Sequence, residues 1–180
     1  MEKGKMMKRR VVITGMGGLS PLGNTVPEMW ENARNGVCGI DYIKSFDTSL
    51  MKVKVAGELK NYHPEDHMDK MSARRTARFT QLALVAARQA MEQSGFDMEK
   101  EDRTRCGVNI SSGIGGLGTI EEEHYKGIKR GFDRISPLFV PMAITNMAAG
   151  MTAIEFGFKG SCTCIVTACA SGTNAIGEAF

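Results

Sequence analysis

The chain has 180 residues, of which 42% are hydrophobic and 24% are charged, and its formal net charge is +3. This composition is that of a globular protein and excludes a chain that is disordered over most of its length. The small net charge, without a long basic run interleaved with aromatic residues, argues against a nucleic-acid partner. No stretch approaches the roughly 20 apolar residues that cross a bilayer, so we expect no membrane-spanning segment.

In chain order, β-branched runs alternate with helical patterns. Strands are predicted over residues 10–15, which we expect to be buried, and over 54–59, 106–113 and 162–168. Helices are predicted from about Pro27 to just before Gly36, over 72–94, over 141–156, and onward from near Cys169. The apolar stripe of the longest helix consists of Phe79, Leu82, Ala83, Ala86, Ala90 and Met91. This alternation predicts an α/β sheet protein.

The N-terminal segment imitates a signal peptide, because a basic head precedes apolar residues. The glycines that begin at Gly15 interrupt the apolar run, so we interpret residues 1–7 as a basic tail and the rest as the start of the domain. The odd number of cysteines does not fit the disulfide framework of a secreted protein, and we expect a cytoplasmic location. These cysteines are Cys38, Cys106, Cys162, Cys164 and Cys169.

The last predicted helix has only begun when the sequence reaches Phe180. A helix that stops there has no C-terminal cap, and its buried face and last carbonyls lack cover. We therefore expect these 180 residues to be part of a longer polypeptide.

A glycine-rich segment over residues 113–118 fits the G-x-G-x-x-G pattern of a dinucleotide-binding turn. It follows a predicted strand, precedes a helical stretch over 119–127, and has Asp133 near the position of a ribose-binding carboxylate. Residues 127–137 contain no apolar run, so the second strand of such a site is missing. We therefore favour a structural or substrate-lining turn over a nucleotide site.

No metal site is predicted. His63 and His67 are four residues apart, but Pro64 lies between them and no further ligand follows in a recognised pattern. Cys162 and Cys164 alternate along a predicted strand, so both should face the same side. We interpret them as buried apolar cysteines.

Cys169 lies at a predicted strand-to-helix turn, among the small residues Ala168, Ala170, Ser171 and Gly172. Unpaired N–H groups and the positive end of a helix dipole favour a thiolate at such a position. The small neighbours allow a bulky acyl group to approach closely. From position alone, a nucleophile and a buried structural cysteine are about equally good interpretations.

The sequence TACASG at residues 167–172 resembles the nucleophile turn of the β-ketoacyl-acyl-carrier-protein synthases. The sequences VVITGMGGLSPLGN, FDTS, SGIGGLG and SPLFVPMAITNMAAG resemble other N-terminal landmarks of that family, in the same order. The resemblance runs from Lys8 to Phe180 and is greatest to the synthase II group of bacterial fatty acid synthesis. It implies a thiolase-like layered α-β-α-β-α fold, of which this chain supplies about the N-terminal half. Ser161 departs from the usual proline, which we expect to alter only the entry to the strand.

The resemblance also implies roles for particular residues. Cys169 matches the nucleophile that accepts an acyl chain as a thioester, and its own N–H matches a donor of the oxyanion hole. Ile114 matches a residue that lines the acyl pocket, and Phe139 one that reaches the partner subunit's pocket in a homodimer. Arg74 and Arg75 match positions that dock the acidic acyl carrier protein. No cofactor is expected, because phosphopantetheine of the carrier protein holds the substrates.

The segment 69–78 contains four basic residues, Lys70, Arg74, Arg75 and Arg78. Arg74 and Arg78 have an i, i+4 spacing, which predicts that they share one helix face and repel each other unless an anion is bound. The alternative is an ordinary solvated helix face.

In the family, two catalytic histidines, a second oxyanion donor and a lysine come from the C-terminal half. His63, His67 and His124 precede Cys169 and match no catalytic position. We therefore expect the parent protein to be an acyltransferase of fatty acid elongation, which condenses the Cys169-bound acyl chain with malonyl-carrier protein by decarboxylative Claisen condensation. This chain alone should be inactive. The alternatives are a non-catalytic carrier-binding or dimer-forming half-subunit, or a polyketide ketosynthase fragment, and acyl chain length preference is left open.

Overall fold

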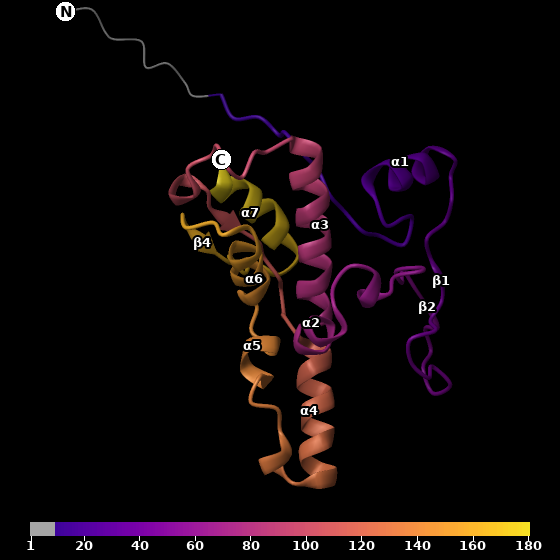
Figure 1. Cartoon of the computed structure of the whole chain (residues 1–180). Coiled ribbons are helices and arrows are strands. Elements are labelled where there is room, and N and C mark those ends of the chain that lie inside the picture. The colour runs from indigo at the N-terminus through magenta and orange to yellow at the C-terminus, as the bar shows by residue number, and fades with distance from the viewer. Residues whose placement is uncertain (1–9) are drawn as a thin grey trace, which may run out of the picture.

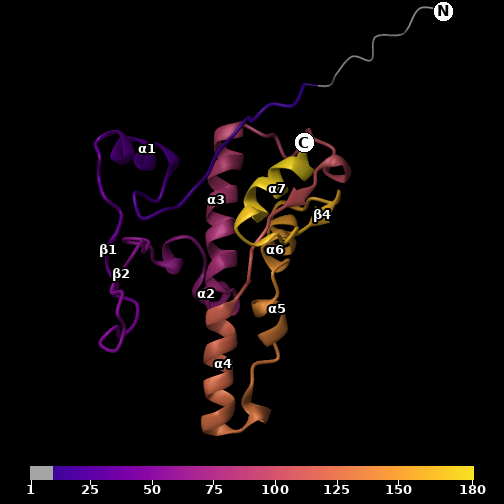
Figure 2. The same ribbon diagram turned by 180° about the vertical axis from the view of Figure 1, so that it is seen from behind.

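The computed structural model describes residues 10–180, so the predicted tail over residues 1–7 lies outside the described residues. A long helix, α3 (Arg78–Ser94), stands between two parts of the molecule (Figures 1 and 2). The N-terminal part lies on one side of α3 and contains α1 (Val26–Arg34), β1 (Asp41–Tyr42) and β2 (Val55–Ala56). The other side holds the last two strands and the last helices, with α4 (Leu117–Arg130) extending beyond them.

The second part is built on a parallel strand pair, β3 (Val108–Asn109) and β4 (Cys162–Thr163). Helix α6 (Met147–Phe156) packs on both strands and on α3, and α7 (Ser171–Ala179) packs on β3. Immediately before β4, the carbonyl of Ser161 accepts a hydrogen bond from the N–H of Val108 at 2.7 Å. Helices therefore cover a parallel sheet, which confirms the α/β class predicted from the sequence.

Most of the buried apolar residues are alanines, and they lie mainly where these helices and strands meet. The full set is Tyr62, Ala77, Leu84, Val85, Val108, Ala143, Ala148, Ala149 and Ala175. Alanine side chains allow α6 to approach α3 and the strands closely, because they add little bulk at the contact. The core is consequently thin, and many larger apolar side chains are exposed.

The buried strand predicted over residues 10–15 is wrong. Val11, Val12 and Ile13 are 54%, 66% and 79% exposed, and no strand is assigned there. The backbone after them is instead held by the side chains of α3. The N–H of Met16 donates to Oε1 of Gln93, and the N–H of Gly18 to Oε1 of Gln89 at 3.0 Å. An extended apolar segment is buried only where a neighbouring strand covers it, and the described residues provide none here.

The single helix predicted over residues 72–94 is divided into α2 (Lys70–Arg75) and α3. Thr76 is extended, with φ −124° and ψ 124°. The buried side chain of Gln81 donates hydrogen bonds to the carbonyls of Ala73, at 2.9 Å, and Thr76, at 2.8 Å. These bonds satisfy two of the carbonyls at the end of α2, so the side chain of Gln81 stabilises the break.

The apolar stripe predicted for this helix is displaced from its observed buried face. Its six residues are only partly buried. The buried residues of α3 are Thr80, Gln81, Leu84 and Val85. The difference arises because the buried face of α3 includes polar side chains, whereas the prediction weighed apolar residues alone.

The helix predicted over residues 141–156 is also divided, into α5 (Phe139–Ala143) and α6. Ile144 is extended, with φ −72° and ψ 144°. The carbonyl of Ala143 accepts a hydrogen bond from the N–H of Gly116 at 2.9 Å, so a distant loop supplies the partner that a continuous helix would have supplied.

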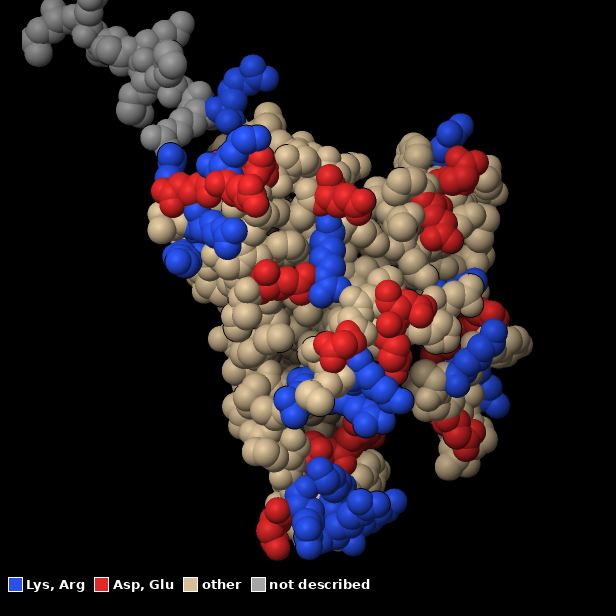
Figure 3. All heavy atoms as spheres, viewed as in Figure 1, with Lys and Arg blue, Asp and Glu red and all other residues tan. Residues whose placement is uncertain are grey.

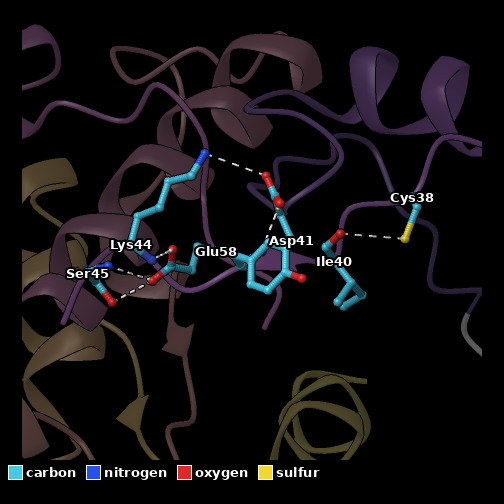
Figure 4. Close-up of polar contacts among 7 residues, drawn as sticks. Cys38, Ile40, Asp41, Lys44, Ser45 and Glu58 are labelled. Carbon is cyan, nitrogen blue, oxygen red and sulfur yellow. Dashed lines mark hydrogen bonds and ion pairs between the residues drawn. The ribbon is translucent and has the colours of Figure 1, made fainter. Parts of the chain in front are cut away.

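The N-terminal part is organised by polar contacts. Strands β1 and β2 pair antiparallel, and the turn after β1 is held by Glu58 (Figure 4). The carboxylate of Glu58 accepts hydrogen bonds from the N–H of Lys44 at 2.8 Å and from both the N–H and hydroxyl of Ser45. Lys44 also pairs with Asp41 at 3.5 Å. The weak strand predicted over 54–59 is confirmed as the short β2.

Helix α1 follows its sequence signals. Thr25 caps its first turn by accepting a hydrogen bond from the N–H of Glu28, Pro27 lies in that turn, and Gly36 follows the helix in a left-handed conformation with φ +68°.

Within residues 10–180, no helix is both long and apolar enough to span a membrane.

Candidate active site

Cys169 lies in the turn between β4 and α7. The short 3₁₀ segment Ala168–Ala170 leads directly into α7, and the Cys169 side chain is exposed. The preceding Ala168 has φ +51°, a left-handed conformation that costs a residue with a Cβ about 1–2 kcal/mol. Such a conformation persists only where the surroundings hold it, and it occurs often at functional sites. The turn therefore presents the thiol at the surface on a constrained backbone.

The turn is fixed by a buried hydroxyl. The Oγ of Ser171 accepts a hydrogen bond from the N–H of Thr167 at 2.9 Å and donates one to the carbonyl of Ala168 at 2.7 Å. A further serine, Ser111, accepts a hydrogen bond from the N–H of Ile165 at 3.2 Å, which joins the ends of the β3 and β4 segments. These bonds connect the Cys169 turn to the sheet.

The glycine-rich loop passes beside this turn. A Cβ built on Gly113 would lie 3.8 Å from the carbonyl oxygen of Ala168, so the two backbones are close. Ile114, which follows in the loop, is 63% exposed. The structure thus places the loop that carries Ile114 next to the turn that carries Cys169.

Two other glycines of the loop, Gly115 and Gly116, have a packing function. Gly115 has φ +78°, and a Cβ there would lie 2.4 Å from the carbonyl oxygen of Ala143. A Cβ on Gly116 would lie 2.4 Å from the carbonyl oxygen of Met142. Only glycine allows the loop to lie this close to α5. This contact accounts for glycine at positions 115 and 116, whereas a Cβ on Gly118 would meet no atom within 4 Å.

Phe139 is the first residue of α5 and is half-buried. The segment before it is anchored to α4, because Ser136 donates its N–H to Oε2 of Glu123 at 2.7 Å. This hydrogen bond, with a smaller contribution from Lys126, lowers the pKa of the Glu123 carboxyl. The role of Phe139 at the pocket of a partner subunit stays a prediction.

Arg74 and Arg75 are exposed in the last turn of α2. Arg74 lines a hollow of about 490 Å³ with Arg78, Glu122 and the glycine-rich loop. Arg75 lines a separate, mainly apolar hollow of about 220 Å³ beside α5 and α6. The predicted common helix face of Arg74 and Arg78 is wrong, because the chain breaks between α2 and α3. The two side chains nevertheless border the same hollow.

Asp69 holds the N-terminus of α2. Its Oδ1 accepts hydrogen bonds from the N–H groups of Met71 at 2.9 Å and Ser72 at 3.0 Å. Hydrogen bonding from Ser72, and then from Met71, lowers the pKa of the Asp69 carboxyl. A carboxylate therefore caps the short helix that carries Arg74 and Arg75.

A second basic cluster gathers over the end of α4 and the residues that follow it (Figure 3). Its members are Lys129, Arg130 and Arg134, all of them exposed. This cluster lies on a different element from Arg74 and Arg75.

The histidines lie outside the nucleophile turn. His63 and His67 flank the 3₁₀ segment Pro64–Asp66, and the His67 ring stacks on Tyr62 with centroids 5.4 Å apart. His124 lies in α4. Within residues 10–180, no cluster of three or more His, Cys, Asp or Glu side chains is arranged to hold a metal ion.

Two expectations about site residues need revision. Cys162 is exposed and Cys164 is half-buried, so the interpretation of both as buried cysteines is wrong. Ser171 was not predicted as a site residue, because in the sequence it counts only as a small side chain. The available signal was its spacing of four residues from Thr167 at the start of a helix, where serine hydroxyls commonly bond to nearby backbone.

Comparison with known proteins places the chain in a family. The family described as "Beta-ketoacyl synthase, N-terminal domain" matches residues 8–180. The chain is 54% identical over 172 residues to 3-oxoacyl-[acyl-carrier-protein] synthase 2 of Staphylococcus aureus (strain COL), which covers 96% of this chain and 42% of that protein. It is 44% identical over 174 residues to the same-named synthase of Coxiella burnetii (strain RSA 493 / Nine Mile phase I), with 97% and 42% covered. The chain thus spans less than half the length of these relatives.

Solved structures share the fold at lower identity. A chain of the AntDE:AntF complex, a type II PKS acyl-carrier protein with its ketosynthase, matches with a TM-score of 0.80 at 24% identity, over 96% of this chain and 46% of that one. The ishigamide ketosynthase/chain length factor matches with a TM-score of 0.83 at 23% identity, over 96% of this chain and 45% of that one. These neighbours confirm the thiolase-like α/β fold, of which this chain covers the N-terminal half. The chain therefore belongs to the β-ketoacyl synthase family and carries the N-terminal domain that bears its cysteine turn.

Proposed function

We propose that this chain supplies the acyl-accepting half of a β-ketoacyl-acyl-carrier-protein synthase of the synthase II group. The observation that carries the proposal is the exposed Cys169 on the constrained turn between β4 and α7, beside the glycine-rich loop. The identity to 3-oxoacyl-[acyl-carrier-protein] synthases supports it.

In the proposed reaction, the sulfur of Cys169 attacks the thioester carbonyl of an acyl chain held on acyl carrier protein. Negative charge develops on the carbonyl oxygen, and N–H groups at the turn, including that of Cys169, stabilise it. The pantetheine thiol then leaves and takes a proton, and the acyl chain remains on Cys169 as a thioester. No cofactor of the protein itself is required for this transfer.

The acyl chain would then be condensed with malonyl-carrier protein by decarboxylative Claisen condensation, which extends a fatty acid. The resemblance assigns that step to histidines in the part of the relatives' length that this chain does not match. Ile114 would border the acyl chain, because its loop lies beside the Cys169 turn.

The proposed partners are acyl carrier protein and a second copy of the protein. The half-buried Phe139 and exposed apolar residues such as Val140 and Ile144 would be covered by that copy. The five cysteines are free, which fits the reducing cytoplasm where we place the protein.

Acyl transfer is tested by incubating the protein, as expressed from its own gene, with acyl carrier protein that holds a saturated acyl chain. Peptide mapping by mass spectrometry should find the acyl group on Cys169, and Cys169→Ala should abolish the adduct. An acyl group on another cysteine, or none, would support the non-catalytic alternative instead.

Carrier docking is tested by the double variant Arg74→Glu, Arg75→Glu. It should raise the KM for acyl carrier protein at low salt, because a basic surface accelerates association with an acidic partner. The matched control reverses the same number of charges at Lys52 and Lys54, which are exposed before β2. An equal rise in KM in both variants would show a general charge effect and refute docking at α2.

A further inference from the structure

Ser171 is 4% exposed and is the first residue of α7. A serine at a helix start commonly bonds forward, to N–H groups of the first turn. Here the hydroxyl bonds backward, to the N–H of Thr167 and the carbonyl of Ala168, and the cap position at Ala170 has no side-chain hydrogen bond. The hydroxyl therefore stabilises the turn around Cys169 rather than the helix that follows.

The carbonyl of Ala168 and the N–H of Cys169 belong to one peptide unit. A trans peptide is planar, so its C=O and N–H point in opposite directions and rotate together. No cis peptide bond occurs among residues 10–180. When Ser171 holds the carbonyl of Ala168 at 2.7 Å, it also fixes the direction in which the N–H of Cys169 points.

The backbone N–H of Ser171 also donates to the Ala168 carbonyl, so the hydroxyl is a second donor to this oxygen, at a residue with φ +51°. Without the hydroxyl, the Ala168 carbonyl would keep one donor and the N–H of Thr167 would lose this acceptor, so the peptide between Ala168 and Cys169 would be held less firmly. The direction of the Cys169 N–H would then be less fixed. The two hydrogen bonds of the hydroxyl and the geometry of the peptide thus assign Ser171 a task at the backbone of Cys169.

We propose that Ser171 is a positioning residue that aims the N–H of Cys169 at the oxygen of the reacting acyl group. This inference rests on the proposed function, because an oxyanion forms only if Cys169 attacks a thioester. It predicts that Ser171 influences acyl transfer more than it influences the thiol itself.

The test compares two reactions of Cys169 in the protein expressed from its own gene. Single-turnover transfer from acyl carrier protein passes through an oxyanion, whereas alkylation by iodoacetamide does not. Ser171→Ala should slow acyl transfer about tenfold or more, as expected when an oxyanion donor is misaligned. Alkylation of Cys169 should slow by a much smaller factor. Ser171→Thr, which keeps the hydroxyl, should restore most of the acyl-transfer rate.

Thr173→Ala is the matched control, because Thr173 is exposed on α7 and also loses a hydroxyl. It should leave both rates unchanged. Equal slowing of the two reactions by Ser171→Ala, or no slowing, would overturn the role of Ser171 while leaving acylation of Cys169 intact. Failure of the unaltered protein to acquire an acyl group on Cys169 would overturn the proposed function and this inference with it.

Discussion

The two sides of α3 are stabilised differently. Between residues 10 and 61 no residue is buried, and the chain is held by side-chain hydrogen bonds such as those of Gln89, Gln93 and Glu58. On the other side, α6, α7 and β3 all contribute buried residues. The turn that carries Cys169 lies on this packed side. Its geometry therefore depends on tertiary packing, whereas the N-terminal part depends on polar contacts.

The largest expected difference between the two sides concerns packing. Leu84 is 4% exposed in α3, and Leu84→Ala should lower the free energy of unfolding by about 2–5 kcal/mol through lost burial and a cavity. Trp30 is larger but 65% exposed, so Trp30→Ala should change the free energy of unfolding by no more than about 0.5 kcal/mol. Urea unfolding measures both. A cost for Trp30→Ala equal to that of Leu84→Ala would contradict the comparison.

A smaller effect is expected where the N-terminal part touches α3. A Cβ on Gly17 would lie 1.8 Å from the carbonyl oxygen of Ala86, so Gly17→Ala must displace backbone. We expect a loss of about 1–3 kcal/mol, typical of overpacking, in thermal or urea unfolding. In Gly177→Ala the new methyl group meets open space within α7, and this control should be neutral or slightly stabilising. Unchanged stability of Gly17→Ala would mean that the segment does not lie against α3.

The smallest predicted effect is a pH dependence at α2. The pKa of Asp69 is lower in the folded protein than in the unfolded chain. The contribution of Asp69 to the free energy of unfolding is therefore fully present above the unfolded pKa of about 4 and is lost as the pH falls through the folded pKa. Asp69→Asn keeps a capping acceptor but cannot titrate. The difference in thermal midpoint between the two proteins should therefore shrink on acidification. A difference that is independent of pH would exclude an ionised cap.

Local signals predicted much of the fold. Pro27 and Gly36 mark the ends of α1, Gly95 ends α3 with φ +64°, and the strand-to-helix turn at Cys169 lies where the sequence places it. The wrong predictions concern segments whose structure depends on residues far away in the sequence. The end of α5 depends on a hydrogen bond from Gly116, and burial of residues 11–13 requires a neighbouring strand. The periodicity of the sequence indicates which side chains are apolar, but it does not indicate which backbone groups form hydrogen bonds with distant residues.

The candidate site shows the same limit. Cys169 was identified from its turn and from the resemblance, and the structure places the loop of Ile114 beside it. The backward hydrogen bonds of Ser171 depend on the left-handed Ala168, which no local pattern specifies. The break between α2 and α3 was missed because it relies on the side chain of Gln81, which the apolar pattern ignores.

The most direct test of the central claim is competition among the five free cysteines for limited iodoacetamide. Cys38 is also exposed and serves as the internal reference. Peptide mapping should show Cys169 alkylated first near neutral pH, and prior incubation with acyl carrier protein that holds an acyl chain should protect Cys169 alone. Preferential labelling of Cys38 or Cys106, with no protection of Cys169, would contradict its assignment as the nucleophile.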